Sequence, residues 1–287
     1  MKVLRFFFYF FFGLFFAIIL LSSFMESFFM PSEQDIRNRI NHNSGQQLKY
    51  QYYTWNTLQM GYVSVGNDTA QRIILVHGSP GSWTNYSMLL EHSEYYNQFN
   101  LIALDRIGYG MSGGGEGEPS LEEQAASIKE LCIPSKGGRK PILIGHSLGG
   151  PIVIKSAIDY SQNLEGVISV AGSFDPDLEF NEFYRGIFKV FPFNLFFNRE
   201  LQASNDELFT HRLELENMAN DWEKIQCKVA ILQGSKDMLV DPKNYDFAAQ
   251  KLKNKNAYLL MIPNEDHFIP FTRPEPIFKA IEMIQKN

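Results

Sequence analysis

The sequence predicts an α/β fold: a mostly parallel sheet of eight strands flanked by helices. Short runs of apolar, often β-branched residues alternate with segments suited to helices, which is typical of parallel strands buried on both faces. One such run passes through Gly145-His146-Ser147-Leu148-Gly149 straight into a helix-compatible segment, Pro151–Tyr160. With 287 residues, 45% of them hydrophobic and 20% charged, the chain can form one large domain with its own core.

Eight predicted strands and their connections account for the main domain, residues 48–287. Leu48–Thr54 and Leu58–Val65 are expected to form a hairpin that leads into the sheet. The other strands are predicted at Arg72–Val76, Asn100–Leu104, Pro141–Ile144, Leu164–Ala171, Lys228–Gln233 and Ala257–Ile262. Further helices are predicted at Leu121–Leu131 and after Pro276, where Ile277, Phe278, Ile281 and Ile284 share one face. Residues 31–47 are polar and are expected to form a linker or a short amphipathic piece.

Residues 1–30 have the pattern of a membrane anchor or a signal segment. Lys2 and Arg5 precede Phe6–Phe24, an uncharged and phenylalanine-rich run. As a helix this run would extend about 28 Å, close to the thickness of the hydrocarbon core of a bilayer. The residues that follow offer no convincing small-residue cleavage site. We therefore expect a single-pass membrane protein with the main domain outside the cytoplasm, and secretion after cleavage is the alternative.

Composition argues against several other classes of protein. A formal net charge of −6 without a Lys/Arg-rich patch argues against binding to nucleic acid. The two cysteines, Cys132 and Cys227, cannot form a disulfide framework, and no Cys/His cluster indicates a zinc site. Two free thiols are the favoured interpretation, with one bridge as the alternative outside the cytoplasm. The oligomeric state is not indicated.

The segment around Ser147 has the pattern of a strand, a sharp turn and a helix, with the serine at the tip of the turn. Residues two before and two after such a serine must lack bulk, which Gly145 and Gly149 satisfy. The turn would lift the hydroxyl to a helix N-terminus, where free N–H groups favour negative charge. A second Gly- and Pro-rich loop, His77-Gly78-Ser79-Pro80-Gly81, follows the strand at Arg72–Val76 and could present backbone N–H groups to the same place.

Three motifs together resemble the α/β-hydrolase family. They are the loops His77–Gly81 and Asp105-Arg106-Ile107-Gly108-Tyr109-Gly110-Met111-Ser112 and the turn Gly145–Gly149, in this order and each after a strand. The first two resemble the branch that holds epoxide hydrolases, dehalogenases, carbon–carbon bond hydrolases and many esterases. Epoxide hydrolases and dehalogenases of that branch carry an aspartate as nucleophile, so Ser147 implies a serine hydrolase. Proline iminopeptidases typically carry a Trp after the serine and a doubled Gly in the first loop, where this chain has Leu148 and Ser79.

The family order of nucleophile, acid and histidine implies that the C-terminal third supplies the acid and the base. Asp237 follows the strand Lys228–Gln233 and matches the family's acid position, whereas Asp175, after the preceding strand, is the alternative. His267 stands after the last strand and matches the base. The remaining histidines are expected to play no part in proton transfer: His77 and His146 to make local contacts, and His42, His92 and His211 to be solvated.

A long connection between the sixth and seventh strands, residues 173–226, resembles the small helical lid of the family. Ser204-x-x-Glu207 matches a capping box that would open one helix, and Leu213–Trp222 suits another. The segment is rich in phenylalanine, more than so short a stretch can bury by itself. Some of these rings are therefore expected to line an apolar pocket or to contact the membrane.

The resemblance implies an acyl-enzyme mechanism on a carboxylic ester or a related acyl substrate with an apolar portion. Ser147 would attack, His267 would take its proton and Asp237 would orient the imidazole. The backbone N–H groups of Ser79 and Leu148 would form the oxyanion hole, and no metal or organic cofactor is required. Carbon–carbon bond hydrolysis and acyl transfer use the same residues. An alternative of another class is a non-catalytic ligand-binding receptor of the same fold.

Overall fold

A computed structural model describes residues 32–113, 116–179, 186 and 198–286. In these ranges one sheet of eight strands has the order β1-β2-β4-β3-β5-β6-β7-β8. The strands are β1 Lys49–Trp55, β2 Leu58–Gly66, β3 Gln71–Val76, β4 Phe99–Leu104, β5 Ile142–His146, β6 Gly166–Val170, β7 Lys228–Gly234 and β8 Ala257–Ile262. Strand β2 runs antiparallel to β1 and β4, and all pairs from β4 to β8 are parallel. The predicted α/β fold and hairpin are confirmed, and each strand lies within two residues of its expected bounds.

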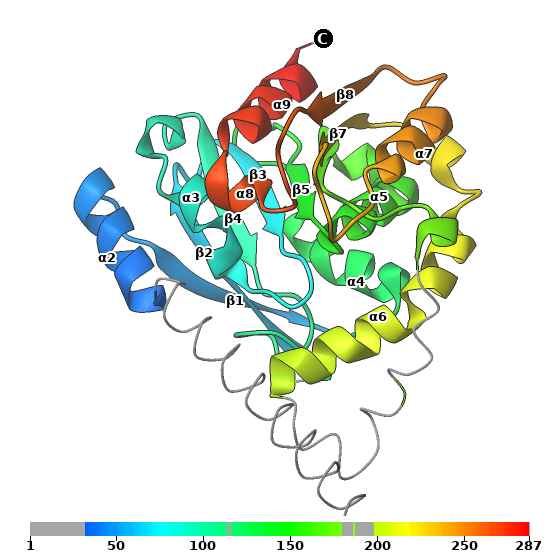
Figure 1. Cartoon of the computed structure of the whole chain (residues 1–287). Coiled ribbons are helices and arrows are strands. Elements are labelled where there is room, and N and C mark those ends of the chain that lie inside the picture. The colour runs from blue at the N-terminus through cyan, green and yellow to red at the C-terminus, as the bar shows by residue number, and fades with distance from the viewer. Residues whose placement is uncertain (1–31, 114–115, 180–185, 187–197, 287) are drawn as a thin grey trace, which may run out of the picture.

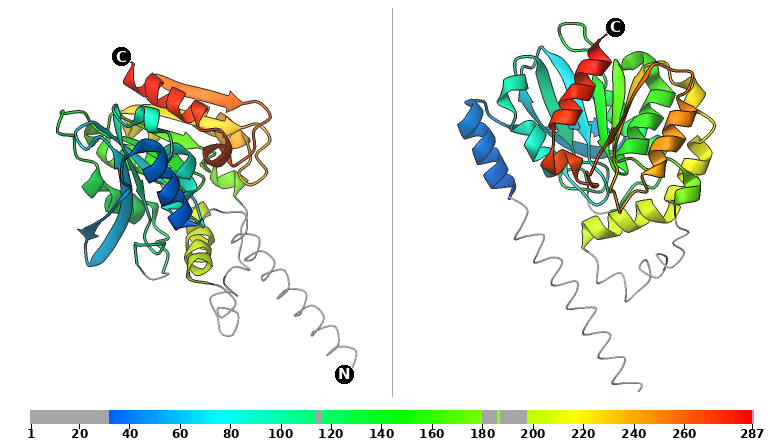
Figure 2. Two further views of the ribbon diagram at one scale, coloured as in Figure 1. Left: turned by 90° about the vertical axis from the view of Figure 1, so that its left-hand side faces the viewer. Right: turned by 45° about the horizontal axis from the view of Figure 1, so that its top comes forward.

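Helices cover both faces of this sheet (Figures 1 and 2). Alternate residues of a strand point to opposite faces, so Ile73 and Leu75 of β3 join one apolar cluster, and Ile74 and Val76 join the other. The first cluster is covered by α2 (Glu33–Ser44), α3 (Ser87–Leu90) and α9 (Glu275–Gln285). The second is covered by α4 (Leu121–Ile128), α5 (Gly149–Tyr160) and α7 (Lys243–Lys251). A sheet buried on both faces explains why its strands are continuous apolar runs in the sequence.

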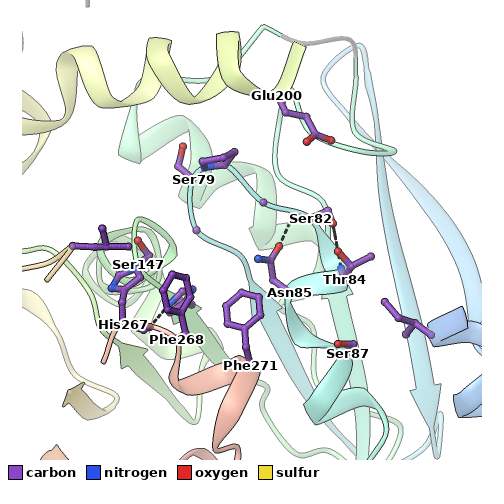
Figure 3. Close-up of a pocket in the computed structure, with 16 residues that line it drawn as sticks. Ser79, Ser82, Thr84, Asn85, Ser87, Ser147, Glu200, His267, Phe268 and Phe271 are labelled. Atoms are coloured by element: carbon purple, nitrogen blue, oxygen red, sulfur yellow. Dashed lines mark hydrogen bonds between the residues drawn. The ribbon is translucent and has the colours of Figure 1, made fainter. Parts of the chain in front are cut away.

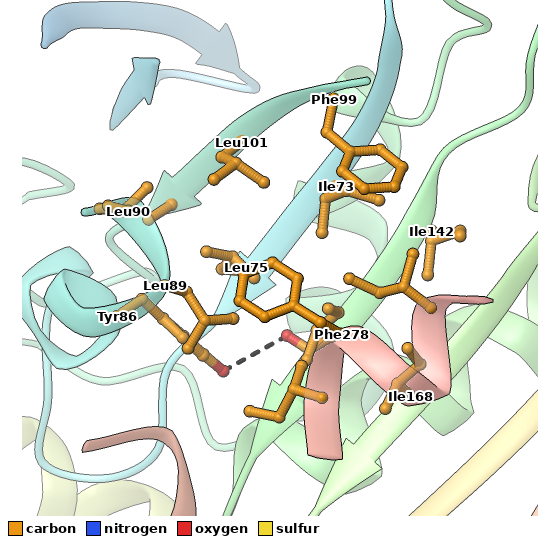
Figure 4. Close-up of a cluster of buried hydrophobic side chains, with 14 of the residues drawn as sticks. Ile73, Leu75, Tyr86, Leu89, Leu90, Phe99, Leu101, Ile142, Ile168 and Phe278 are labelled. Carbon is orange, nitrogen blue, oxygen red and sulfur yellow. Dashed lines mark hydrogen bonds between the residues drawn. The ribbon is translucent and has the colours of Figure 1, made fainter. Parts of the chain in front are cut away.

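The first cluster also fixes the ends of β3 and β5, the two strands that lead into the loop at His77 and the turn at Ser147. Phe278 of α9, on the helix face predicted to be apolar, lies over β3 and β5 beside Leu75 (Figure 4). The Tyr86 hydroxyl points to the carbonyl oxygens of Val76, at 2.9 Å, and Ile144, at 3.4 Å. Tyr86 therefore ties together the carboxyl ends of β3 and β5, from which the loop at His77 and the turn at Ser147 emerge.

Residues 33–44 of the expected linker or amphipathic piece form helix α2. Ser32 caps this helix by accepting a hydrogen bond from the backbone N–H of Asp35. Ile36 and Ile40 are 1% and 0% exposed and pack into the first core cluster. The segment is therefore part of the packed domain, and the amphipathic alternative describes it.

The predicted anchor Phe6–Phe24 lies outside the residues that the structure describes. Among the described residues, no helix is both long enough and apolar enough to cross a bilayer. Cys132 and Cys227 are free thiols, as favoured from the sequence.

The lid connection contains one long helix, α6 (Arg199–Met218), which lies across one end of the body (Figure 1). Its cap is Asn198, whose side chain accepts a hydrogen bond from Leu201 N–H at 2.8 Å. The prediction of a helix opening at Ser204-x-x-Glu207 and of a separate second helix is therefore wrong. Ser204 and Glu207 match the capping pattern, but they lie inside α6 and are buried against the body.

Most of the phenylalanines expected to line a lid pocket fall between positions 180 and 197, outside the described residues. Phe174 is buried and packs edge-on against Trp222, with ring centroids 5.3 Å apart. Phe209 of α6 is 46% exposed. Among the lid rings that the structure describes, Phe174 thus belongs to the core.

Candidate active site

Ser147 lies in the turn between β5 and α5 with a positive φ of 53°. A non-glycine residue adopts this conformation only when its surroundings hold it there. A Cβ on Gly145 would collide with the carbonyl oxygen of Gly149, and one on Gly149 would collide with the carbonyl oxygen of Val76. The two glycines therefore allow the turn to pack tightly and place the serine hydroxyl at the N-terminus of α5, where partial positive charge favours an anion.

His267 and Asp237 form a hydrogen-bonded pair beside this turn. His267 follows β8 and Asp237 follows β7; both residues are 5% exposed, and His267 Nδ1 lies 2.8 Å from Asp237 Oδ2. The other carboxylate oxygen of Asp237 accepts the backbone N–H groups of Leu239 and Val240, each at 2.9 Å. Burial opposes ionisation of Asp237, but the hydrogen bond from His267 and these two N–H groups outweigh it and hold the pKa of Asp237 below its ordinary value. A carboxylate at this place fixes the Nδ1–H tautomer of His267 and leaves Nε2 free to accept a proton.

The other candidate acid has a different role. Asp175 caps a short 3₁₀ helix (Pro176–Leu178), where its side chain accepts the N–H of Asp177 at 3.0 Å. Asp266, which directly precedes the histidine, accepts the N–H of Phe268 at 2.8 Å. Of these three carboxylates, the structure brings Asp237 to the imidazole of His267.

Two further histidines make the local contacts expected from the sequence. The ring of His146 donates through Nε2 to the carbonyl oxygen of His267 at 2.9 Å and so supports the loop that carries this residue. Burial lowers the pKa of His146 to about 3, so the ring is neutral and serves as a fixed donor. His77 contacts the carbonyl oxygen of Gly78 through Nδ1 at 2.7 Å.

Ser147 and His267 border two adjoining cavities, which we call the loop lobe and the lid lobe. The loop lobe, with a volume of 420 Å³, lies between the loop that follows β3 and the segment with Phe268 and Phe271 (Figure 3). The lid lobe, with a volume of 350 Å³, is lined by Glu179, Leu208, His211 and Arg212 among others. Ser79, Ser147, Leu239 and His267 border both lobes. A reacting group at Ser147 could therefore extend one substituent into each lobe.

The lid lobe contains two titratable groups that the sequence analysis did not assign to a site. His211 was expected to be solvated, which is wrong: it is 3% exposed, and its Nε2 lies 2.7 Å from Ser173 Oγ. Burial, and then the charge of Arg106, lower its pKa to about 4, so His211 is neutral at physiological pH. Burial, and then the charge of Asp175, raise the pKa of Glu179 to about 7. The described lining of the lid lobe therefore combines these titratable groups with apolar side chains such as Leu208 and Val240. Most of the phenylalanines expected to line an apolar pocket lie outside the described residues, so that expectation stays a prediction.

The two predicted oxyanion donors also border this site. Ser79 borders both lobes, and Leu148 borders the lid lobe. Among the described residues, no carbonyl or side chain accepts the backbone N–H of either residue. Both N–H groups can therefore bind an oxygen atom of a ligand. In the part of the chain that the structure describes, no three His, Cys, Asp or Glu side chains are grouped to hold a metal ion.

The known proteins whose sequences are similar to this chain include several hydrolases. The chain is 23% identical over 271 residues to the proline iminopeptidase PfmaB of Pestalotiopsis fici, covering 79% of this chain and 95% of that protein. It is 32% identical over 115 residues to Epoxide hydrolase 4 of Mus musculus, covering 39% of this chain and 31% of that protein.

Solved structures with the same fold include a membrane phospholipase A, with a TM-score of 0.65 at 16% identity, covering 96% of this chain and 99% of that one. A putative aryl esterase from Burkholderia cenocepacia has a TM-score of 0.64 at 21% identity, covering 83% and 100%. At such identities the likeness concerns the fold alone. A sequence profile of the alpha/beta hydrolase family, however, matches residues 73–280, a span that begins in β3 and contains Ser147, Asp237 and His267. The chain therefore belongs to the α/β-hydrolase family.

Proposed function

We propose that this hydrolase is a serine hydrolase that cleaves a carboxylic ester or a related acyl compound through an acyl-enzyme. The observation that carries the proposal is the buried His267–Asp237 pair, whose imidazole borders the same two cavities as the strained Ser147. A hydroxyl at a helix N-terminus, an imidazole and a carboxylate behind it are the three groups that nucleophilic acyl transfer requires.

The proposed reaction has two halves. In the first, His267 Nε2 takes the proton of Ser147 as the serine oxygen bonds to the acyl carbon, and the imidazolium then gives that proton to the departing alcohol. In the second, a water molecule takes the place of the alcohol, and His267 removes its proton as the water oxygen bonds to the acyl carbon. The imidazolium then returns this proton to Ser147 Oγ as the acyl–serine bond breaks and the acid is released. Asp237 stays ionised throughout, because its lowered pKa reflects stabilisation of the carboxylate.

The backbone N–H groups of Ser79 and Leu148 are the proposed oxyanion donors. Each tetrahedral intermediate carries a negative oxygen, and preorganised donors stabilise this charge more than the neutral carbonyl. A single donor of this kind contributes about 3–4 kcal/mol to transition-state stabilisation in comparable enzymes.

An ester with an apolar portion fits the site best. Phe268, Phe271 and Leu239 border the loop lobe and give it apolar walls. The lid lobe combines apolar side chains with the titratable groups of Glu179 and His211. Carbon–carbon bond hydrolysis and acyl transfer remain alternatives that use the same three residues. Peptide hydrolysis is a further alternative, since the chain is similar to a proline iminopeptidase and Glu179 and Arg212 in the lid lobe could bind a charged substrate.

The N-terminal run Phe6–Phe24 forms part of the proposal as a membrane anchor, with the hydrolase domain outside the cytoplasm. Its length and lack of charge support this assignment. The full chain should then stay with membranes after a carbonate wash and keep the mass of the uncleaved protein. A chain found in the medium that begins after residue 24 would instead show cleavage of a signal peptide.

The decisive experiment is a panel of p-nitrophenyl esters, thioesters and amides of graded acyl length, with Ser147→Ala as the control. The variant should lose about 10⁴- to 10⁶-fold in kcat, because the nucleophile is removed. The wild type should turn over at least one ester faster than any amide. Wild-type rates in Ser147→Ala would eliminate the proposal. If the wild type binds an ester but turns over none of the panel, the alternative of a non-catalytic ligand-binding receptor would be favoured.

A further inference from the structure

A buried ion pair joins the lid helix to the loop that carries a proposed oxyanion donor. Glu207 of α6 and Arg106, which follows β4, are 2% and 1% exposed, and Arg106 Nη1 contacts Glu207 Oε1. Burial alone would lower the pKa of Arg106, but the charge of Glu207 outweighs this effect and raises it. Burying two charges costs several kcal/mol per ion before their attraction is counted, so such a pair is weak support for stability. Its position suggests a functional role.

Glu207 binds more than the arginine. Its Oε2 accepts the hydroxyl groups of Ser79 and Tyr109, each at 2.7 Å, and Arg106 Nη2 at 3.1 Å. Its Oε1 accepts Gln124 Nε2 at 2.7 Å. The carboxylate of a lid residue therefore holds the side chain of Ser79 directly. Figure 3 shows Ser79 in the loop that borders the cavity beside Ser147.

Arg106 holds the backbone just before Ser79. Its Nη2 donates to the carbonyl oxygen of Gly78 at 2.7 Å, and its Nε donates to the carbonyl oxygen of His77 at 2.9 Å. The backbone N–H of Arg106 donates to His77 Nε2 at 3.0 Å, so the proton of the neutral ring is on Nδ1, which donates to the same Gly78 oxygen at 2.7 Å. Two donors thus fix the carbonyl of Gly78.

This carbonyl determines where the oxyanion donor points. The Gly78–Ser79 peptide is trans, and in a planar trans peptide the C=O and N–H bonds point in opposite directions. Fixing the Gly78 oxygen against Arg106 therefore fixes the direction of the Ser79 N–H. A positive charge on the carbonyl also polarises the peptide and makes its N–H a stronger donor.

We propose that Glu207 is a positioning residue, which couples the docking of the lid helix α6 against the body to the direction in which the Ser79 N–H points. The carboxylate holds the Arg106 guanidinium against the Gly78 carbonyl and holds the Ser79 side chain, so the oxyanion donor is in place when α6 is docked. The inference rests on the proposed function, since it assigns a role to the oxyanion hole of that mechanism. A simple tether would use the same contacts but would affect only stability.

The test compares Glu207→Gln with Glu214→Gln. Glu214 is a matched control because it lies on the same helix and also binds the body, where it accepts the N–H of Leu121 at 2.9 Å. Ester hydrolysis by Glu207→Gln should lose about 10- to 100-fold in kcat, with KM within about twofold, because the donor acts mainly in the transition state. Affinity for an alkyl trifluoromethyl ketone, which forms a tetrahedral adduct with the serine, should fall by the same factor. Glu214→Gln should change neither quantity by more than about twofold.

Three results are decisive, all measured on protein that is folded by circular dichroism. Equal kcat and inhibitor affinity in the two variants, with only a lower melting temperature for Glu207→Gln, would reduce Glu207 to a tether and overturn the inference. If Glu207→Gln does not fold, the double variant Arg106→Gln/Glu207→Gln removes both charges and should show the same loss in kcat; wild-type kcat there overturns the inference. Full activity in Ser147→Ala would instead overturn the proposed function itself.

Discussion

The body and the lid of this molecule hold the side chains of the candidate site in different ways. In the body, the parallel strands β5, β7 and β8 lead at their carboxyl ends to Ser147, Asp237 and His267, respectively. The sheet itself therefore brings these residues to one edge. The lid helix α6 has no continuous apolar stripe and buries polar residues such as Glu207 and His211 against the body. The difference suggests that the body carries the chemistry, whereas the lid adjusts its geometry and selectivity. Changes in the two regions should therefore have separable effects.

The largest of the remaining effects is expected in the body, at the acid. Asp237→Asn keeps the shape of the side chain but removes the charge that fixes the tautomer of His267, so kcat should fall by about 10⁴-fold. Asp175→Asn is the matched control, because Asp175 caps a short helix away from the imidazole. Its kcat should stay within about twofold of the wild type. Stopped-flow or steady-state ester hydrolysis measures kcat for both variants. A larger loss in Asp175→Asn would show that Asp175, and not Asp237, is the acid that supports His267.

A smaller and pH-dependent effect is expected in the lid lobe, at Glu179. Its pKa of about 7 means that the carboxyl is neutral below this pH and charged above it. The ratio of kcat/KM for butyrylcholine to that for 3,3-dimethylbutyl butyrate, its neutral isostere, should therefore rise by up to about fivefold as the pH passes from 6 to 8. His211 stays neutral over this range because its pKa is about 4, so it should not contribute a step.

Glu179→Gln should flatten this ratio. The same variant bears on stability with a definite sign: a carboxyl whose pKa is raised in the folded state contributes stability at low pH, which is lost as the pH rises through about 7. Glu179→Gln should therefore show a weaker decline of the melting temperature between pH 5 and pH 8. An unchanged selectivity step in this variant would place the charged group elsewhere in the lobe.

The smallest effect on activity is expected in α2, at a core residue that borders neither lobe. Ile40 is fully buried in the first core cluster and does not border either lobe, so Ile40→Ala should lower the free energy of unfolding by about 2–5 kcal/mol. Its kcat should remain within about twofold of the wild type. Urea denaturation measures the loss, with His42→Ala on the exposed side of the same helix as the control. A wild-type midpoint for Ile40→Ala would show that α2 is no part of the packed domain.

The sequence predicted the body well because its signals are local. Strands such as β3 and β5 are buried on both faces and therefore form unbroken apolar runs, and Gly145 and Gly149 are required by sterics at a turn of this kind. The placement of Asp237 and His267 came from the resemblance to a family, and their distance of 2.8 Å could not be read from the sequence. Their catalytic roles stay predictions.

The lid was predicted less well, because its burial depends on distant partners. Ser204 and Glu207 match a helix-capping pattern, but Glu207 finds Arg106 across 101 positions, which no local signal indicates. His211 lies among polar residues in the sequence, and its burial follows only from the docking of α6 against Ser173. Since hydrophobic periodicity is the main sequence signal for a buried helix face, a helix that buries polar groups gives none.

The most direct measurement is covalent labelling by a fluorophosphonate, followed by mass spectrometry of the digested protein. The account predicts one adduct, on the peptide that contains Ser147, which disappears in Ser147→Ala and forms far more slowly in His267→Ala. A wild-type protein that remains unlabelled, or an adduct on another residue while ester turnover continues, would contradict the central claim that Ser147 is the nucleophile.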